Sequence, residues 1–198
     1  MKTVIAKIRG ISPYSQSKNY EVEKADHGKE SARDYEGRTW RERMHYTPEG
    51  EVFIPPMALK NCLAECAKFL SERIPGKGKA TWTKHFEAGV LVLEPAMLGI
   101  QKDDVEGVWY FLPSDGVRGS GRRVWKCMPE IKEDWETTAT FYILDETINE
   151  ETFRHHLDEA GKFIGLGRFR PRNSGFFGRF IVDDVQWDVK PEPVRKAA

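Results

Sequence analysis

Several protein classes are excluded by what the sequence lacks. Its 198 residues contain only three cysteines, an odd number without a CxxC pair, which argues against a disulfide framework or a zinc ribbon. No apolar run approaches the roughly 20 residues that cross a bilayer, and the first residues lack the apolar stretch of a signal peptide. We therefore expect a globular protein with a cytoplasmic location and no membrane partner.

Net charge is also lacking. The 31 basic and 31 acidic residues cancel, so basic residues can attract nucleic acid only where they cluster. The common nucleotide-binding fingerprints fail as well. Gly161-Lys162 is followed by Phe163 where a Walker loop needs serine or threonine, and these glycines follow a predicted helix instead of a first strand. No cofactor is expected.

The most distinctive segment present is the glycine-rich loop, residues 161–180. It holds five basic side chains, five glycines and five phenylalanines, and no acidic residue. Glycine lets backbone N–H groups approach a bulky anion, arginine forks onto phosphate oxygens, and phenylalanine stacks on unpaired bases. The segment therefore indicates binding of single-stranded nucleic acid. The alternative is a glycine-rich hairpin whose phenylalanines belong to the core.

Two polar segments add further candidates. Residues 113–136 contain glycines and a basic cluster between 117 and 126, which predicts a hairpin tip that bears arginines. Residues 11–50 show no sustained period, and a structureless loop of that length is uncommon inside a compact domain. We interpret this stretch as an insertion that meets a ligand or a neighbouring subunit, with a solvated loop as the alternative.

The hydrophobic pattern predicts an α+β fold in a single domain, residues 1–198. The order βαββαβ predicts an antiparallel sheet with both helices on one face, as in a ferredoxin-like or RRM-like palm. The aromatic RNP1 octamer of ordinary RRMs is absent. The second helix has a possible capping box, Thr147 with Glu150, and Gly161 as its closing residue. Strands are predicted at 3–9, 89–93, 108–112, 137–144 and 180–189, and helices at about 57–71 and from the capping box at Thr147 through Ala160.

In this setting two segments resemble the RAMP superfamily of CRISPR-associated proteins. Residues 160–180 look like its C-terminal glycine-rich signature. Residues 53–60 are similar to the opening of the first helix in the backbone subunits of CRISPR effector complexes, although Met57 and Asn61 stand where serine or glycine is usual. The resemblance implies a palm, a thumb-like hairpin at 113–136, a variable insertion at 11–50, and copies aligned along a guide RNA in an antiviral ribonucleoprotein.

The resemblance also implies the partners and the contacts. The partners would be guide RNA or other single-stranded RNA, copies of the chain itself and other CRISPR effector subunits. Because the contacts address phosphates and base faces, we expect a non-enzymatic grip that is independent of sequence. The predicted RNA-binding residues are Lys18, Arg41, Arg43, Lys60, Arg118, Arg122, Arg123, Lys126, Arg168, Phe169, Arg170, Arg172, Phe176 and Arg179.

Three alternatives stay open. Some RAMP proteins are metal-independent endoribonucleases that cut the guide precursor, for which His27 or His45 would be the general base. The short chain also suits a reduced, virus-borne homologue. A structural protein-interaction module, whose arginines pair with protein carboxylates, is the third alternative and predicts assemblies that are insensitive to salt and nuclease.

No metal site is expected. His155 and His156 are adjacent on a predicted helix, where successive side chains point about 100° apart. Asp183 and Asp184 lie on or beside the last strand, where neighbouring residues face opposite sides. Asp26 and Asp34 of the insertion are interpreted as solvated acids or as partners of arginine.

Overall fold

The computed structural model describes residues 1–25, 28–114, 119 and 121–190. The strands are β1 (Lys2–Gly10), β2 (Glu51–Ile54), β3 (Val90–Leu91), β4 (Ala96–Gln101), β5 (Glu106–Pro113), β6 (Arg123–Glu130), β7 (Glu136–Ile143) and β8 (Phe180–Gln186). The α-helices are α1 (Ala32–Thr39), α2 (Pro56–Leu70), α3 (Thr83–Gly89) and α4 (Glu150–Glu159). Shorter helical turns are η2 (Trp40–Arg43), η3 (Lys102–Asp104), η4 (Ala160–Ile164) and η5 (Pro171–Asn173).

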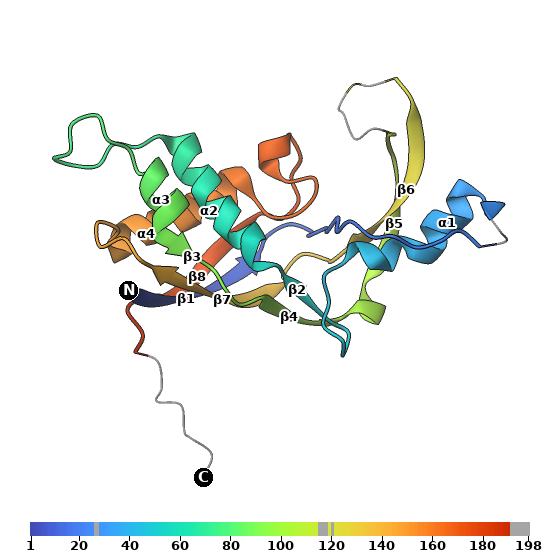
Figure 1. Cartoon of the computed structure of the whole chain (residues 1–198), viewed down its shortest axis with the longest axis horizontal. Helices are drawn as coiled ribbons and strands as arrows, with labels where there is room; N and C mark the ends of the chain where they lie inside the picture. The colour runs from blue at the N-terminus through green and yellow to red at the C-terminus, as the bar shows by residue number, and fades with distance from the viewer. Residues whose placement is uncertain (26–27, 115–118, 120, 191–198) are drawn as a thin grey trace, which may run out of the picture.

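A four-stranded antiparallel sheet forms the palm. Its strand order is β3-β7-β1-β8, with β1 paired to both β7 and β8. Val4, Ala6 and Ile8 alternate along β1 and are fully buried on one face. Helices α2, α3 and α4 cover one face of this sheet (Figure 1). The core lies between these helices and the sheet.

Helix α2 follows from its sequence pattern. Pro56 occupies the first turn, where a missing N–H costs nothing, and Leu59, Cys62, Leu63 and Cys66 recur at helical spacing and are buried. The two cysteines are free thiols inside the core. The helix ends at Ser71, which adopts the left-handed conformation.

Helix α4 differs from the prediction at both ends. Its N-cap is Asn149, whose side chain accepts a hydrogen bond from Thr152 N, so the predicted Thr147 capping box is wrong. Gly161 does not close the helix either, because the chain continues through the π-helical turn η4. A Cβ on Gly161 would lie 2.1 Å from the carbonyl oxygen of Phe180, so only glycine lets this turn pack onto β8.

The thumb hairpin, β5 with β6, projects from the palm as a separate two-stranded sheet (Figure 1). Its register runs from Glu106 opposite Glu130 to Pro113 opposite Arg123. The hairpin therefore spans 106–130 instead of the predicted 113–136, and residues 108–112 belong to it instead of the palm. The apolar run at 108–112 suggested a buried palm strand. In β5, however, these residues are only partly buried or exposed, as expected for a hairpin that projects from the palm.

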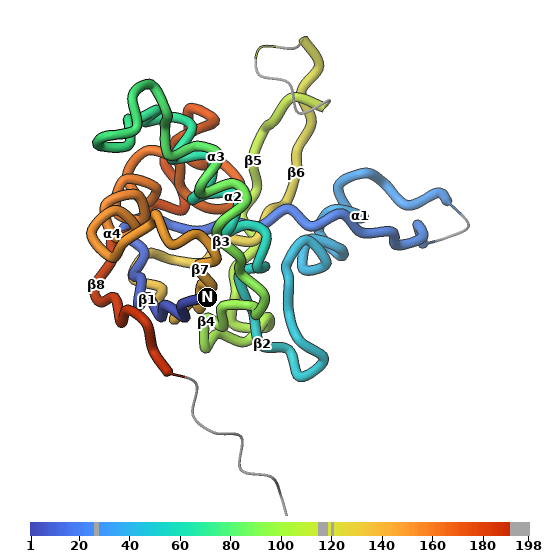
Figure 2. Tube along the Cα trace, turned by 60° about the vertical axis from the view of Figure 1, so that its left-hand side comes forward, coloured from blue at the N-terminus to red at the C-terminus, as the bar shows by residue number. Residues whose placement is uncertain are grey.

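The first insertion has structure of its own. It contains α1 and η2, and Figure 2 shows it as a second arm that extends from the palm beside the thumb hairpin. The two arms meet at their bases, where Trp40 of η2 packs against Gly107 of β5.

The predicted α+β class with antiparallel sheets is confirmed. The palm follows the order β1, α2 with α3, β3, β7, α4, β8, but the chain does not follow βαββαβ without interruption. Strands β2 and β4 pair in a sheet of their own, and α3 occupies much of the segment before β3. Among the described residues, no helix is both long and apolar enough to cross a membrane.

Candidate nucleic-acid interface

The glycine-rich loop folds against the segment that follows β1. Arg168 N donates to the carbonyl of Ser15 at 2.8 Å, and Gly178 N donates to that of Pro13 at 2.7 Å. Gly167 has φ +69°, and a Cβ there would lie 2.2 Å from Ser15 O. The glycine thus permits this close approach, and these loop N–H groups are used within the protein instead of facing an anion. Side chains must supply most of any contact with a ligand.

The loop and the thumb hairpin enclose a cleft of about 450 Å³, here called the thumb cleft. Three of the predicted contacts, Arg123, Arg168 and Phe169, line it together. The ring of Phe169 lies 5.2 Å from that of Tyr110 on β5, which ties the loop to the hairpin. The complete lining is Phe111, Leu112, Pro113, Gly119, Arg123, Arg168, Phe169 and Asn173.

Exposed aromatic side chains lie on the hairpin and on the glycine-rich loop. Phe111 and Trp125 stand opposite each other on the hairpin, with ring centroids 5.3 Å apart and exposed fractions of 49% and 52%. Phe176 of the glycine-rich loop is 60% exposed, whereas Phe177 is buried and is not available for stacking. Sequence reasoning missed Phe111 and Trp125, whose adjacent exposed rings are candidates for stacking.

Arg168 occupies the junction between the thumb cleft and a second hollow of about 270 Å³. Its Nη1 donates to Ser17 Oγ at 3.2 Å, and its guanidinium lies 5.0 Å from the ring of Phe169. Its Nε is buried without a hydrogen-bond partner among the described residues. Burial and the nearby Arg43 guanidinium lower the pKa of Arg168. Its charge is thus incompletely compensated within the protein.

The second hollow also contains His45, the runner-up general base. Tyr14, Gln16 and Ser17 line it together with His45, whose ring lies 5.8 Å from that of Phe53. Burial and the positive charge of Lys18 lower the pKa of His45, so its imidazole is neutral at pH 7. A neutral imidazole that lines the same hollow as the Arg168 guanidinium is suited to accept a proton near a phosphate.

A third hollow, of about 710 Å³, lies along α2 and brings together Lys60, Arg170 and Arg172. Both arginines pair with one carboxylate, Glu65, at 2.9 Å and 3.1 Å. The Arg172 guanidinium also lies 5.8 Å from the ring of Phe69. A phosphate that binds here must compete with Glu65.

Arg43 and Lys126 both form ion pairs with one buried carboxylate. Glu36 of α1 accepts from Arg43 at 2.8 Å and from Lys126 of β6 at 2.7 Å, and its side chain is buried. This triad fixes the first insertion to the thumb hairpin. The sequence indicated the two cations but not Glu36, because nothing local marks the pairing of residues 90 positions apart.

The remaining predicted residues lie around this surface. Lys18 and Arg122 are exposed, Arg41 is paired with Asp103 at 3.7 Å, and Arg179 donates to the carbonyl of Lys162. Arg118, His27 and Asp26 lie outside the described residues.

No protein-family model matches the sequence, and no curated protein is similar to it. The chain is similar to a chain in the structure of the type III-B Cmr-beta bound to cognate target RNA, with a TM-score of 0.58 and 11% identity. That match covers 94% of this chain and 60% of the other, so this chain spans less than two thirds of its length. Cmr6 from Pyrococcus furiosus is also similar, with a TM-score of 0.47, 14% identity, and 91% and 97% of the chains covered. The likeness to the chain of the Cmr-beta structure shows a shared fold.

Proposed function

We propose that the chain is a RAMP-type protein that binds single-stranded RNA through the glycine-rich loop and the thumb hairpin. The observation that carries the proposal is Arg168, whose buried Nε lacks a partner among the described residues, at the junction of two hollows. A phosphate bound in either hollow would compensate the guanidinium charge. The fold supports the proposal, because the similar Cmr-beta chain belongs to a complex bound to target RNA.

The chemistry of the surface favours a single strand over a duplex. Arg123 and Arg168 provide charge in the cleft, and Phe111, Trp125 and Phe176 offer exposed ring faces. Stacking of an unpaired base on an aromatic ring contributes about 1–3 kcal/mol and tolerates any base. Bases inside a duplex are already stacked and cannot reach these rings. The grip is therefore independent of sequence.

The finer role that we propose is that of a guide-RNA backbone subunit in a CRISPR effector-type ribonucleoprotein. Three hollows follow the glycine-rich loop, since Arg168 lines two of them and Arg170 lines the third. Such a track suits an extended strand better than a compact ligand. Copies of this chain and other effector subunits are the proposed protein partners.

Fluorescence anisotropy of an end-labelled single-stranded RNA tests this proposal. The double variant Phe111→Ala/Trp125→Ala should bind about 5- to 150-fold more weakly, which corresponds to the 1–3 kcal/mol of one lost stacking contact. The matched control is Leu93→Ala/Leu144→Ala. It removes two apolar side chains that are 63% and 46% exposed and that line none of the three hollows. This control should bind RNA with the wild-type affinity. Equal affinity of all three proteins would reject the aromatic contacts.

A second candidate function is metal-independent RNA cleavage at His45, favoured by the neutral imidazole that shares a hollow with Arg168. His45 would take the proton of a 2′-hydroxyl, and Arg168 would stabilise the phosphate. Incubation of labelled RNA with the protein in excess EDTA tests this candidate. Cleavage that disappears in His45→Ala supports the enzyme, and intact RNA throughout rejects it.

A further inference from the structure

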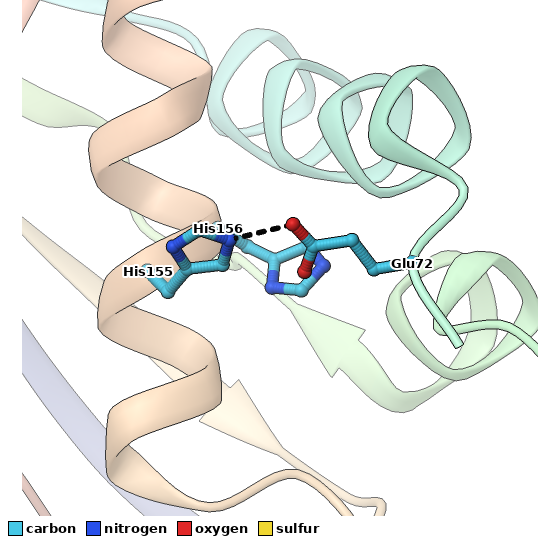
Figure 3. Close-up of side chains that lie close together, drawn as sticks. All are labelled: Glu72, His155 and His156. Carbon is cyan, nitrogen blue, oxygen red and sulfur yellow. Dashed lines mark hydrogen bonds and ion pairs between the residues drawn. The ribbon is translucent and has the colours of Figure 1, made fainter. Parts of the chain in front are cut away.

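A cluster apart from the three hollows brings together Glu72, His155 and His156 (Figure 3). One ligand atom from each residue lies within 4.8 Å of the others. Glu72 follows the left-handed Ser71 that ends α2, and its carbonyl accepts from Trp82 N. The sequence predicted no joint metal site here, because successive side chains on a helix diverge; in the structure Glu72 reaches across from another element and lies near both rings.

His156 presents an unpaired acceptor to this cluster. The residue is fully buried, with its ring stacked 4.3 Å from that of Phe86. Its Nδ1 lies 2.8 Å from the carbonyl oxygen of Thr152, so Nδ1 carries the proton of the neutral ring and Nε2 carries the lone pair. Nε2 is buried and has no hydrogen-bond partner among the described residues. A buried acceptor without a partner destabilises the fold.

A cation would satisfy this lone pair, and the other two side chains supply suitable ligands. His155 Nε2 lies 3.0 Å from Glu72 Oε1, and both side chains are close to half exposed. Both can therefore take other rotamers without disturbing the core, whereas His156 is held by its packing. Two imidazoles and a carboxylate are typical ligands of zinc, whereas calcium and magnesium require oxygen ligands.

We propose that Glu72, His155 and His156 bind a divalent transition metal, most readily Zn²⁺, with water in the fourth position. Metal–ligand bonds of about 2.1 Å place tetrahedral ligands about 3.4 Å apart, so the half-exposed Glu72 and His155 must close on the metal. The metal would link the end of α2 to α4. Because α4 continues through η4 into the glycine-rich loop, this link would fix the base of the loop.

Untagged protein, stripped with a chelator and titrated with ZnCl₂ in a calorimeter, tests the proposal. We expect one equivalent of Zn²⁺ to bind and the melting temperature to rise with zinc. Co²⁺ in its place should give the intense visible absorption of a tetrahedral site. Glu72→Gln and His155→Ala should each lower the affinity at least about 10-fold, since even changes outside the ligand set cost that much.

Two further variants separate a metal site from a packing role. His156→Phe keeps a ring against Phe86 but removes Nε2, so it should fold and lose zinc binding. His85→Ala, which removes a histidine paired with Asp145 instead, should keep zinc binding. The proposal is overturned if no saturable binding of Zn²⁺ occurs, or if binding survives in both Glu72→Gln and His155→Ala.

Discussion

Replacement of Arg168, Arg170 and Arg172 by alanine should weaken RNA binding and flatten its salt dependence while the chain still folds. Each side chain lines one or two of the hollows along the glycine-rich loop. The triple variant removes three proposed phosphate contacts and leaves Lys60 and Arg123 in place. The prediction therefore concerns the number of phosphates that the protein neutralises.

The expected salt dependence of RNA affinity follows from the release of counterions from the RNA. Five neutralised phosphates on a single strand give a log–log salt slope of about −3.5, at about −0.7 per phosphate. A fourfold increase in salt then weakens wild-type binding by about 130-fold. With two contacts left, the slope is about −1.4 and the same increase costs only about 7-fold.

Stability should change little, because these ion pairs are partly solvated. The side chains of Arg170, Arg172 and Glu65 are 25%, 48% and 30% exposed. Ion pairs of this kind contribute about 0.2–1 kcal/mol each. A loss of unfolding free energy well above about 2 kcal/mol would show that the arginines act in folding, and the binding result could not then be assigned to RNA contacts.

The assay is anisotropy of a labelled single-stranded RNA at several salt concentrations. The matched control replaces Lys77 and Lys79, between α2 and α3, and Arg154 of α4 by alanine, which removes the same charge. Figure 1 shows these segments away from the thumb hairpin. We expect the control to keep the wild-type slope. A triple arginine variant with the wild-type slope would refute the site, and equal flattening in both variants would point to overall charge.

Three other predictions follow from single residues. Glu36→Ala leaves Arg43 buried without its partner, so urea denaturation should show a loss of about 3 kcal/mol; a loss under about 1 kcal/mol would contradict the buried triad. Gly167→Ala forces a Cβ against Ser15 O at φ +69°, and we expect a destabilisation above about 1 kcal/mol, with normal thermal stability as the contrary outcome. Burial lowers the pKa of His45, so the unfolded chain binds the proton more readily and stability falls as the pH drops below about 6.5. His45→Gln should show a smaller fall between pH 7 and pH 5, and an equal fall would assign that dependence to other groups.

The palm could be predicted where a single period dominates the sequence. The alternation of Val4, Ala6 and Ile8 gave β1, and the helical spacing of Leu59, Cys62 and Cys66 gave α2 within one residue at each end. Short elements were less predictable. The apolar run from 89 to 93 indicated a strand, but α3 extends through Gly89 and β3 keeps only two residues.

The sequence predicted the basic residues of the candidate site but not the residues that pair with them. Clusters of basic residues indicated Arg168 and Arg123, and both line one cleft in the structure. The pairing of Arg170 and Arg172 with Glu65, more than 100 residues away, depends on tertiary structure, as does the convergence of Glu72 on the two histidines. The exposure of Trp125 likewise depends on the register of the thumb hairpin.

Absorbance at 260 and 280 nm across a size-exclusion peak, with and without ribonuclease, shows whether the chain carries RNA. We expect the protein to purify in a large, RNA-containing particle that shrinks on nuclease treatment, with an RNA length per subunit that gives the footprint. A nucleic-acid-free protein that also fails to shift when single-stranded RNA is added at low salt would contradict the proposed RNA binding.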